Sequence, residues 1–344
     1  MSRLDSAVSA HHRRRKRLAA GVAAGMVREW RRIDMANLDG SWPGVLARML
    51  AILTAGQRQA AADADAYVGR VLRAQHVTPD PLGSVDPDAF AGVASDGRPL
   101  ASLLYSPVAD GKKALSDGMS ARDVLVRESA RVAMIAATQV ADAGRIADQT
   151  AMAVDEQVRG YIRHVTLPAC ARCIILAGRF YRWSDGFDRH PGCDCIHIAA
   201  RGDDWVDEQD PQDLFDEMRR NHPERLRKSV TAADLKALDH GADLNQVVNA
   251  HRGVKRVSAY GETLRATDEG LTKRGFAGQR LMREAGTKTQ STHQRLTERG
   301  VTTVRLRGAR TPRMSPDQIF LDAERNGWDR DEVIRQLRRF GFVS

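Results

Sequence analysis

The sequence predicts a mainly α-helical protein that carries one small β-hairpin module. Two observations lead to this fold class. Hydrophobic residues make up 42% of the 344 positions but aromatic residues only 5%, with abundant alanine, which favours aliphatic helix packing over a β-sandwich. Apolar residues also recur at helical spacing in several long segments, and helix-start signals precede some of them.

The N-terminal half is expected to be a helical domain at residues 18–160, preceded by a basic arm at residues 1–17. Residues 18–33 and 44–72 carry apolar side chains at helical spacing, and the Asp-Gly-Ser-Trp-Pro segment at 39–43 is expected to break the helix between them. The interval 76–96 holds three prolines and several aspartates and glycines, which is typical of a loop.

A long helix is predicted to follow this loop. Ser120 and Asp123 have the spacing of a capping box, and small or aliphatic residues then repeat every three, four or seven positions along one face. These residues are Leu125, Val132, Ala136, Val140, Ala143 and Ala147. The small side chains on that face predict close packing against another helix.

Three further segments complete the chain. Residues 201–253 are expected to form short helices, one of which begins at a capping box made by Thr231 and Asp234. Residues 254–314 are rich in glycine, threonine and arginine with weak periodicity, so we expect a basic linker that is extended or partly disordered. Residues 315–344 are expected to form a helical hairpin, with Ser315 and Pro316 at the start of its first helix.

All four cysteines fall within 26 residues, in the segment 161–200 that we treat as a separate module. They form two close pairs, a Cys-x-x-Cys and a Cys-x-Cys, and His190 lies just before the second pair. Two such pairs can converge on one tetrahedral Zn²⁺ ion. The expected ligands are Cys170, Cys173, Cys193 and Cys195, with His190 as the substitute for one cysteine, and we expect His197 at the surface or behind the ligands.

Disulfide bonds are the alternative for these cysteines. A Cys-x-Cys pair does not easily reach disulfide geometry, and cross-pairing of the two pairs would need an oxidising compartment, for which the sequence offers no convincing secretory signal. Four thiolates would close the coordination shell, so the expected Zn²⁺ is structural and not catalytic. The intervening residues fit a small hairpin, with a strand at 179–183 and a turn at 184–186, whose tiny core of aromatic residues needs a metal to fold.

The net charge of +9 is compatible with contact to nucleic acid. One basic block covers residues 11–17, and residues 271–313 hold eleven Lys or Arg against two Glu. We expect both blocks to neutralise phosphate without reading sequence. The candidate contacts are Arg13, Arg14, Arg15, Lys16, Arg17, Lys273, Arg274, Arg305 and Arg307. Either block could equally dock on an acidic protein surface. No apolar run is long enough to span a membrane.

The cysteine segment resembles the signature of the MuF-like minor head proteins of actinobacterial tailed phages. The resemblance rests on Cys-x-x-Cys, Gly-Arg-Phe-Tyr-Arg-Trp at 178–183 and Arg-His-Pro-Gly-Cys-Asp-Cys at 189–195. Further similar segments, in the expected order, are 95–105, 139–145, 241–249 with 252–253, and 338–342. The family's cysteines and histidine correspond to Cys170, Cys173, Cys193, Cys195 and His190, and the resemblance does not fix which four bind the metal.

The resemblance implies a minor capsid protein without enzymatic activity. Such a protein associates with the portal, scaffold or capsid interior, with genomic DNA as a further possible partner and with no membrane or small-molecule substrate. It would be found in the virion, and in the host cytoplasm during assembly. Two other functions stay open at this point: a zinc-knuckle DNA endonuclease of the His-Asn-His kind, for which the spacing of the cysteine pairs is unfavourable, and a DNA-binding regulator that reads duplex through the C-terminal hairpin.

Overall fold

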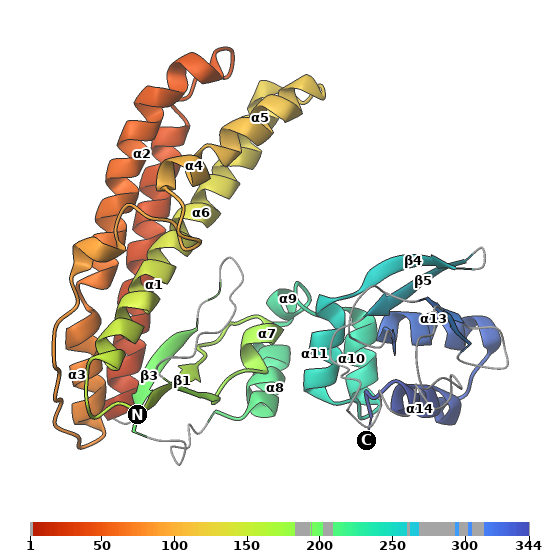
Figure 1. Cartoon of the computed structure of the whole chain (residues 1–344). Helices are drawn as coiled ribbons and strands as arrows, with labels where there is room; N and C mark the ends of the chain where they lie inside the picture. The colour runs from red at the N-terminus through yellow and green to blue at the C-terminus, as the bar shows by residue number, and fades with distance from the viewer. Residues whose placement is uncertain are drawn as a thin grey trace. The chain divides into compact units, whose positions relative to one another are not determined.

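The computed structural model confirms that the protein is mostly helical (Figure 1). It describes residues 3–182, 193, 195–201, 209–259, 262–267, 293–295, 302–304 and 313–343. The chain divides into two compact units: residues 1–166 with 177–209, and residues 167–176 with 210–344. No helix in the described part of the chain is long and apolar enough to cross a membrane.

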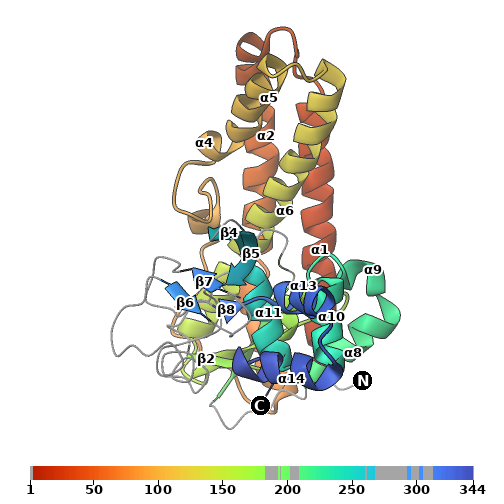
Figure 2. The same ribbon diagram turned by 90° about the vertical axis from the view of Figure 1, so that its right-hand side faces the viewer.

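The first unit is built on three long helices that run side by side, α1 (Arg3–Trp30), α2 (Leu38–Ala61) and α6 (Ala121–Ala153) (Figures 1 and 2). Shorter elements pack on this bundle. They are α3 (Ala64–Ala74), the 3₁₀ turn η1 (Pro87–Phe90), α4 (Leu100–Leu104) and α5 (Ser106–Ser116). The face predicted for the long helix is confirmed, since Val132, Ala136 and Val140 are fully buried in the bundle core.

The expected helix break at residues 39–43 is wrong, because this segment forms the start of α2. The Asn37 side chain accepts a hydrogen bond from the Gly40 amide and caps the helix. Pro43 lies inside the helix and cannot donate to a carbonyl one turn earlier. Burial of Leu38 and Trp42 in the bundle core offsets that missing bond.

The segment predicted as a basic arm is also corrected. Helix α1 starts at Arg3 and runs without a break through the basic block, and it packs against α2, α3 and α6. His11 and His12 are 0% and 5% exposed. Residues 3–17 are therefore part of the first unit, because helical spacing turns one face of this block into the core.

A three-stranded antiparallel sheet lies at one end of the bundle, with strand order β2-β1-β3. Its strands are β1 (Gly160–His164), β2 (Phe180–Arg182) and β3 (Ile196–Ala200). The predicted strand at 179–183 exists as β2, but it pairs with β1, and the predicted turn at 184–186 lies outside the described residues.

The described strands of the cysteine segment share their core with the helical bundle. Tyr161 of β1 and Ile198 of β3 share one hydrophobic cluster with Tyr67 of α3 and Met152 of α6. The described strands therefore depend on residues far apart in sequence, which supply the apolar surface on which they pack, and the rest of the expected aromatic core lies outside the described residues.

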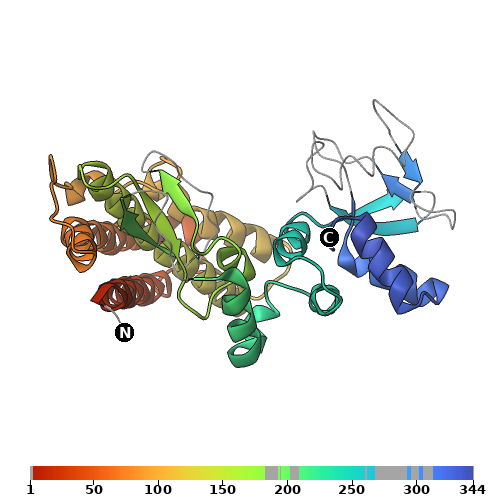
Figure 3. The same cartoon turned by 90° about the horizontal axis from the view of Figure 1, so that it is seen from below.

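The second unit combines short helices with strands. Its first helices are α7 (Ala171–Ile174), α8 (Pro211–Asn221), α9 (Pro223–Leu226), α10 (Ala232–Asp239) and α11 (Leu244–Arg252). The strands β4 (Lys255–Ala259), β5 (Glu262–Thr267) and β8 (Arg313–Met314) form an antiparallel sheet, and β6 (His293–Arg295) pairs with β7 (Thr302–Val304). The helices α13 (Pro316–Asn326) and α14 (Arg330–Arg339) end the chain, drawn in blue beside the cyan strands in Figure 3.

Local signals in this unit act as the sequence predicts. Thr231 and Asp234 make a complete capping box at the start of α10, and the Ser315 side chain caps α13. Gly327 ends α13 with a φ of 62°, a left-handed conformation that suits glycine. The predicted C-terminal hairpin is confirmed, with Ile319 and Leu337 fully buried in a shared core. The stretch expected to be extended contains the strands β4 to β8.

Candidate metal centre

The four cysteines lie at the ends of short elements. Cys170 is the N-cap residue of α7 and Cys173 lies within that single helical turn, while Cys193 and Cys195 lead into β3. None of these four cysteines is in a disulfide bond. The Sγ atoms of Cys170 and Cys173 are 3.4 Å apart, and those of Cys193 and Cys195 are 3.0 Å apart. Both separations far exceed a disulfide bond of about 2.05 Å.

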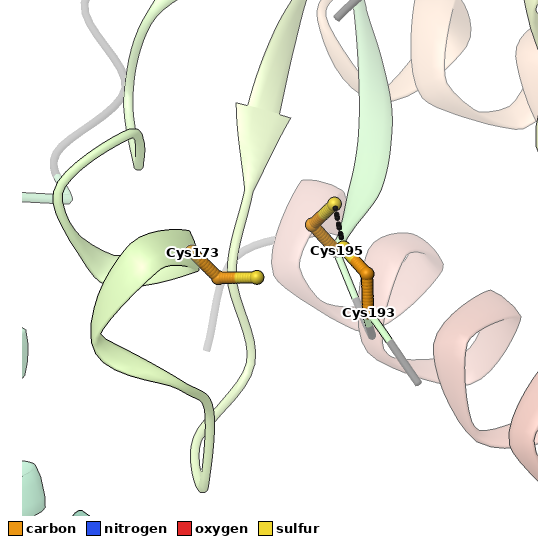
Figure 4. A group of neighbouring side chains, drawn as sticks. All are labelled: Cys173, Cys193 and Cys195. Atoms are coloured by element: carbon orange, nitrogen blue, oxygen red, sulfur yellow. Dashed lines mark hydrogen bonds between the residues drawn. The ribbon is translucent and has the colours of Figure 1, made fainter. Parts of the chain in front are cut away.

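Three of the predicted ligands come together in one buried group (Figure 4). The Sγ atoms of Cys173, Cys193 and Cys195 all lie within 4.8 Å of one another, and these residues are 2%, 5% and 1% exposed. Zn–S bonds of about 2.3 Å in a tetrahedron place sulfur atoms about 3.8 Å apart, so the thiol group fits the size of such a site. This cluster could hold a metal ion. Cys170 is half-buried beside Cys173, and His190 lies outside the described residues.

Two buried arginines surround Cys193. Arg163 of β1 is 2% exposed, and its Nη2 atom lies 3.8 Å from the Cys193 sulfur. Arg145 of α6 is 5% exposed and donates a hydrogen bond to the Cys193 carbonyl. Positive charge next to a thiol stabilises its thiolate, the form that binds metal. Sequence reasoning missed both arginines, because α6 and β1 meet the cysteines only in the folded chain.

Of the two places expected for His197, the surface is wrong. It is 0% exposed on β3, and its ring centroid is 4.2 Å from that of Tyr161. The backbone carbonyl of His197 accepts a hydrogen bond from the Tyr67 hydroxyl at 2.6 Å. Every residue of β3 is buried, since the strand lies between β1 and the helices α3 and α6.

The candidate nucleic-acid contacts on α1 differ in their surroundings. Arg13, Lys16 and Arg17 are exposed. Arg14 is exposed but pairs with Asp63 at 2.8 Å, and the Arg15 side chain is only 10% exposed and pairs with Asp148 at 2.8 Å. Arg15 stays a predicted contact, but its charge is already balanced by Asp148 within the bundle. The other four candidates, Lys273, Arg274, Arg305 and Arg307, lie outside the described residues.

The sequence also gave no sign of a charged network that His11 organises. Its Nδ1 atom lies 3.0 Å from Asp63 and its Nε2 atom 3.0 Å from Asp148, and the ring stacks on Tyr67 at 3.6 Å. Burial raises the pKa of the Asp63 carboxyl, but hydrogen bonds from His11, Arg14 and Arg70 outweigh burial and hold that pKa well below its usual range. The network thus joins α1 to the start of α3 and to α6.

Comparison with known proteins gives one match. No curated protein and no solved structure matches the chain. A family model described as VG15 protein matches residues 3–221, which is more than half of the chain and includes the helical bundle and all four cysteines. The chain therefore belongs to the VG15 protein family, a family of phage proteins.

Proposed function

We propose that this protein is a MuF-like minor head protein of a tailed phage, with a structural role and no enzymatic activity. The observation that carries the proposal is the family match over residues 3–221, which spans the same bundle and cysteine segment on which the resemblance to MuF-like proteins rests. The two lines of evidence agree on a phage protein, and the cysteine signature supports the narrower assignment.

The metal in this proposal is Zn²⁺ in a structural role. Cys170, Cys173, Cys193 and Cys195 are the ligands, and His190 is the substitute for one cysteine. The thiols of Cys173, Cys193 and Cys195 are grouped and buried, and the Cys170 Sγ atom lies 3.4 Å from the Cys173 Sγ atom. Thiolates select Zn²⁺ among the common cellular cations, and a full set of four leaves no open position for catalysis.

The proposed partners are the portal and the capsid or scaffold proteins, with packaged DNA contacted without sequence preference. Arg13, Lys16 and Arg17 on the exposed face of α1 support the DNA contact, since they can neutralise phosphate. We place the protein inside the phage head, and in the host cytoplasm during assembly, with no membrane and no small-molecule substrate.

The experiment that tests the role is mass spectrometry of purified phage particles, separated into heads and tails. We expect the protein in the heads at low copy number, and its absence from complete particles would overturn the proposal. A plasmid-nicking assay with Mg²⁺ or Mn²⁺ checks the absence of enzymatic activity, where cleavage that His190→Ala abolishes would favour an endonuclease instead.

The metal is tested on the full chain purified without chelator. We expect close to one zinc per chain in the wild type and none in Cys193→Ser/Cys195→Ser. Ser229→Ala is the matched control, because it removes a hydroxyl that accepts from the Ala171 amide at the start of α7 but no candidate ligand. Equal zinc in the double variant would show that the metal assignment is wrong.

A further inference from the structure

A groove of about 980 Å³ lies in the second unit, between α10, β5 and the C-terminal hairpin. Its lining includes Lys236 of α10, His240 at the C-cap of α10 and Phe320 of α13, together with Trp328 and Arg330 where the chain enters α14. Its volume is that of a ligand site, and no residue of the metal centre lines it.

One end of the groove is positively charged. Lys236 of α10 and the C-cap residue His240 lie one turn apart, with the Lys236 Nζ atom 4.6 Å from the centre of the Phe320 ring and the His240 ring stacked on Phe320 at 5.9 Å. Burial, and then the charges of Arg330 and Lys236, lower the pKa of His240, so both cations act on this imidazole. Within the described part of the chain, neither Lys236 nor Arg330 has an acidic side chain at ion-pair distance.

The same groove holds hydrogen-bonding atoms that lack a partner. The Trp328 Nε1 and His240 Nδ1 atoms are shielded from solvent, and no hydrogen-bond acceptor or donor in the described residues reaches them. Shielded polar atoms normally find partners, and leaving one unpaired is costly. An anionic ligand would supply acceptors to the indole N–H and to the two cations together.

The residues that line the groove favour an acidic peptide over a nucleic acid as the anionic partner. Lys236 covers the Phe320 ring, so this ring is not open for stacking on a nucleic-acid base. The carboxylates of Asp317, Glu324 and Asp329 also line the groove, so a ligand with continuous negative charge, such as a phosphate backbone, is repelled more than a separate carboxylate that contacts only the cationic end. Aliphatic surface is available instead, since Leu321 is 41% exposed at the same groove.

We propose that this groove binds an acidic peptide segment of a partner protein. A glutamate or aspartate carboxylate would lie against Lys236 and Arg330, and an adjacent aliphatic side chain would pack on Leu321 and Trp328. The proposal stands on the second unit alone, so its failure would leave the zinc and head-protein proposals untouched.

The test is an NMR titration of the ¹⁵N-labelled full chain, followed at the Trp328 indole signal, which Trp328→Phe identifies. The probes are a capped Leu-Glu-Leu-Glu-Leu peptide, the matching Leu-Gln-Leu-Gln-Leu peptide and a short oligothymidylate. We expect a saturable shift with the glutamate peptide and at least tenfold weaker binding of the glutamine peptide, because only the former carries carboxylates.

Variants locate the site. Lys236→Gln/Arg330→Gln should weaken binding of the glutamate peptide at least tenfold, while Arg335→Gln should leave it unchanged, because Arg335 is exposed on α14 and already pairs with Glu332. No shift at millimolar peptide, equal binding of both peptides by the wild type, or tighter binding of oligothymidylate would each overturn the proposal. The comparison of the two peptides needs only the wild type, so the test holds even where a variant does not fold.

Discussion

Replacing Gly144 by alanine should destabilise the helical bundle, although the same change stabilises most helices. Gly144 is buried on α6, and an added Cβ atom would coincide with the guanidinium of Arg15. That guanidinium is not free to move aside. It pairs at 2.8 Å with Asp148, which lies one turn further along α6 and is only 1% exposed.

The size of the effect follows from two opposing contributions. Alanine in place of glycine within a helix is worth about 1 kcal/mol in its favour. Separating a buried ion pair costs about 3–5 kcal/mol, because it leaves a buried charge without its partner. Asp148 keeps its contact with His11 at 3.0 Å, which places the loss at the lower end. The net expectation is a decrease of about 2–3 kcal/mol in the free energy of unfolding.

Urea denaturation followed by tryptophan fluorescence measures this change, since Trp30 and Trp42 are buried in the bundle core. The matched control is Gly21→Ala on α1, where nothing lies within 4 Å of the added Cβ and a small stabilisation is expected. A second comparison uses Arg15→Met, in which Gly144→Ala should lose most of its cost. If Gly144→Ala stabilises the protein as much as Gly21→Ala does, the reasoning about Arg15 is refuted.

Three further predictions follow from other contacts. Arg163→Met should weaken zinc binding about tenfold in a chelator competition, since it removes the cation 3.8 Å from the Cys193 sulfur, and the exposed Arg159→Met should not. The hydrogen bond to Asp234 raises the pKa of His251, so the stability from this pair is fully present below about pH 6.5 and is lost as the pH rises through the raised pKa. The His251 side chain is 31% exposed, so the loss should stay under about 1 kcal/mol. Urea titrations at several pH values measure the free energy of unfolding of wild type and His251→Gln, and the same change with pH in both proteins would contradict this prediction. Thr231→Ala should cost about 1 kcal/mol by removing the cap of α10, and an unchanged melting temperature would speak against that role.

The pattern of the sequence predicted the elements whose signals are local. Capping residues such as Thr231 and Ser315 act within one helical turn, and the apolar face of α6 needs only the helical period. The expected break at residues 39–43 failed for the opposite reason. Proline and glycine are local signals against a helix, but the buried Trp42 is held by contacts with distant residues.

The candidate metal site also has some features that the sequence shows and others that only folding creates. Spacing alone singled out the four cysteines, because the order of ligand residues along a chain is a local property. That three of them meet within 4.8 Å is a result of folding. The arginines around Cys193 belong to α6 and β1, which are separated from it by many residues and could not be assigned to the site beforehand.

The sequence by itself determined the mainly helical class, the positions of most helices and the identity of the candidate metal ligands. Only the tertiary structure decided which charges are used inside the protein. The block at residues 11–17 looks like a uniform basic surface, yet His11 and Arg15 are paired with Asp63 and Asp148 in the bundle, while Arg13 and Arg17 remain outside. The physical reason is that a helix turns neighbouring residues to different faces, and the partner of each face is set by the packing of helices that lie far apart in the chain.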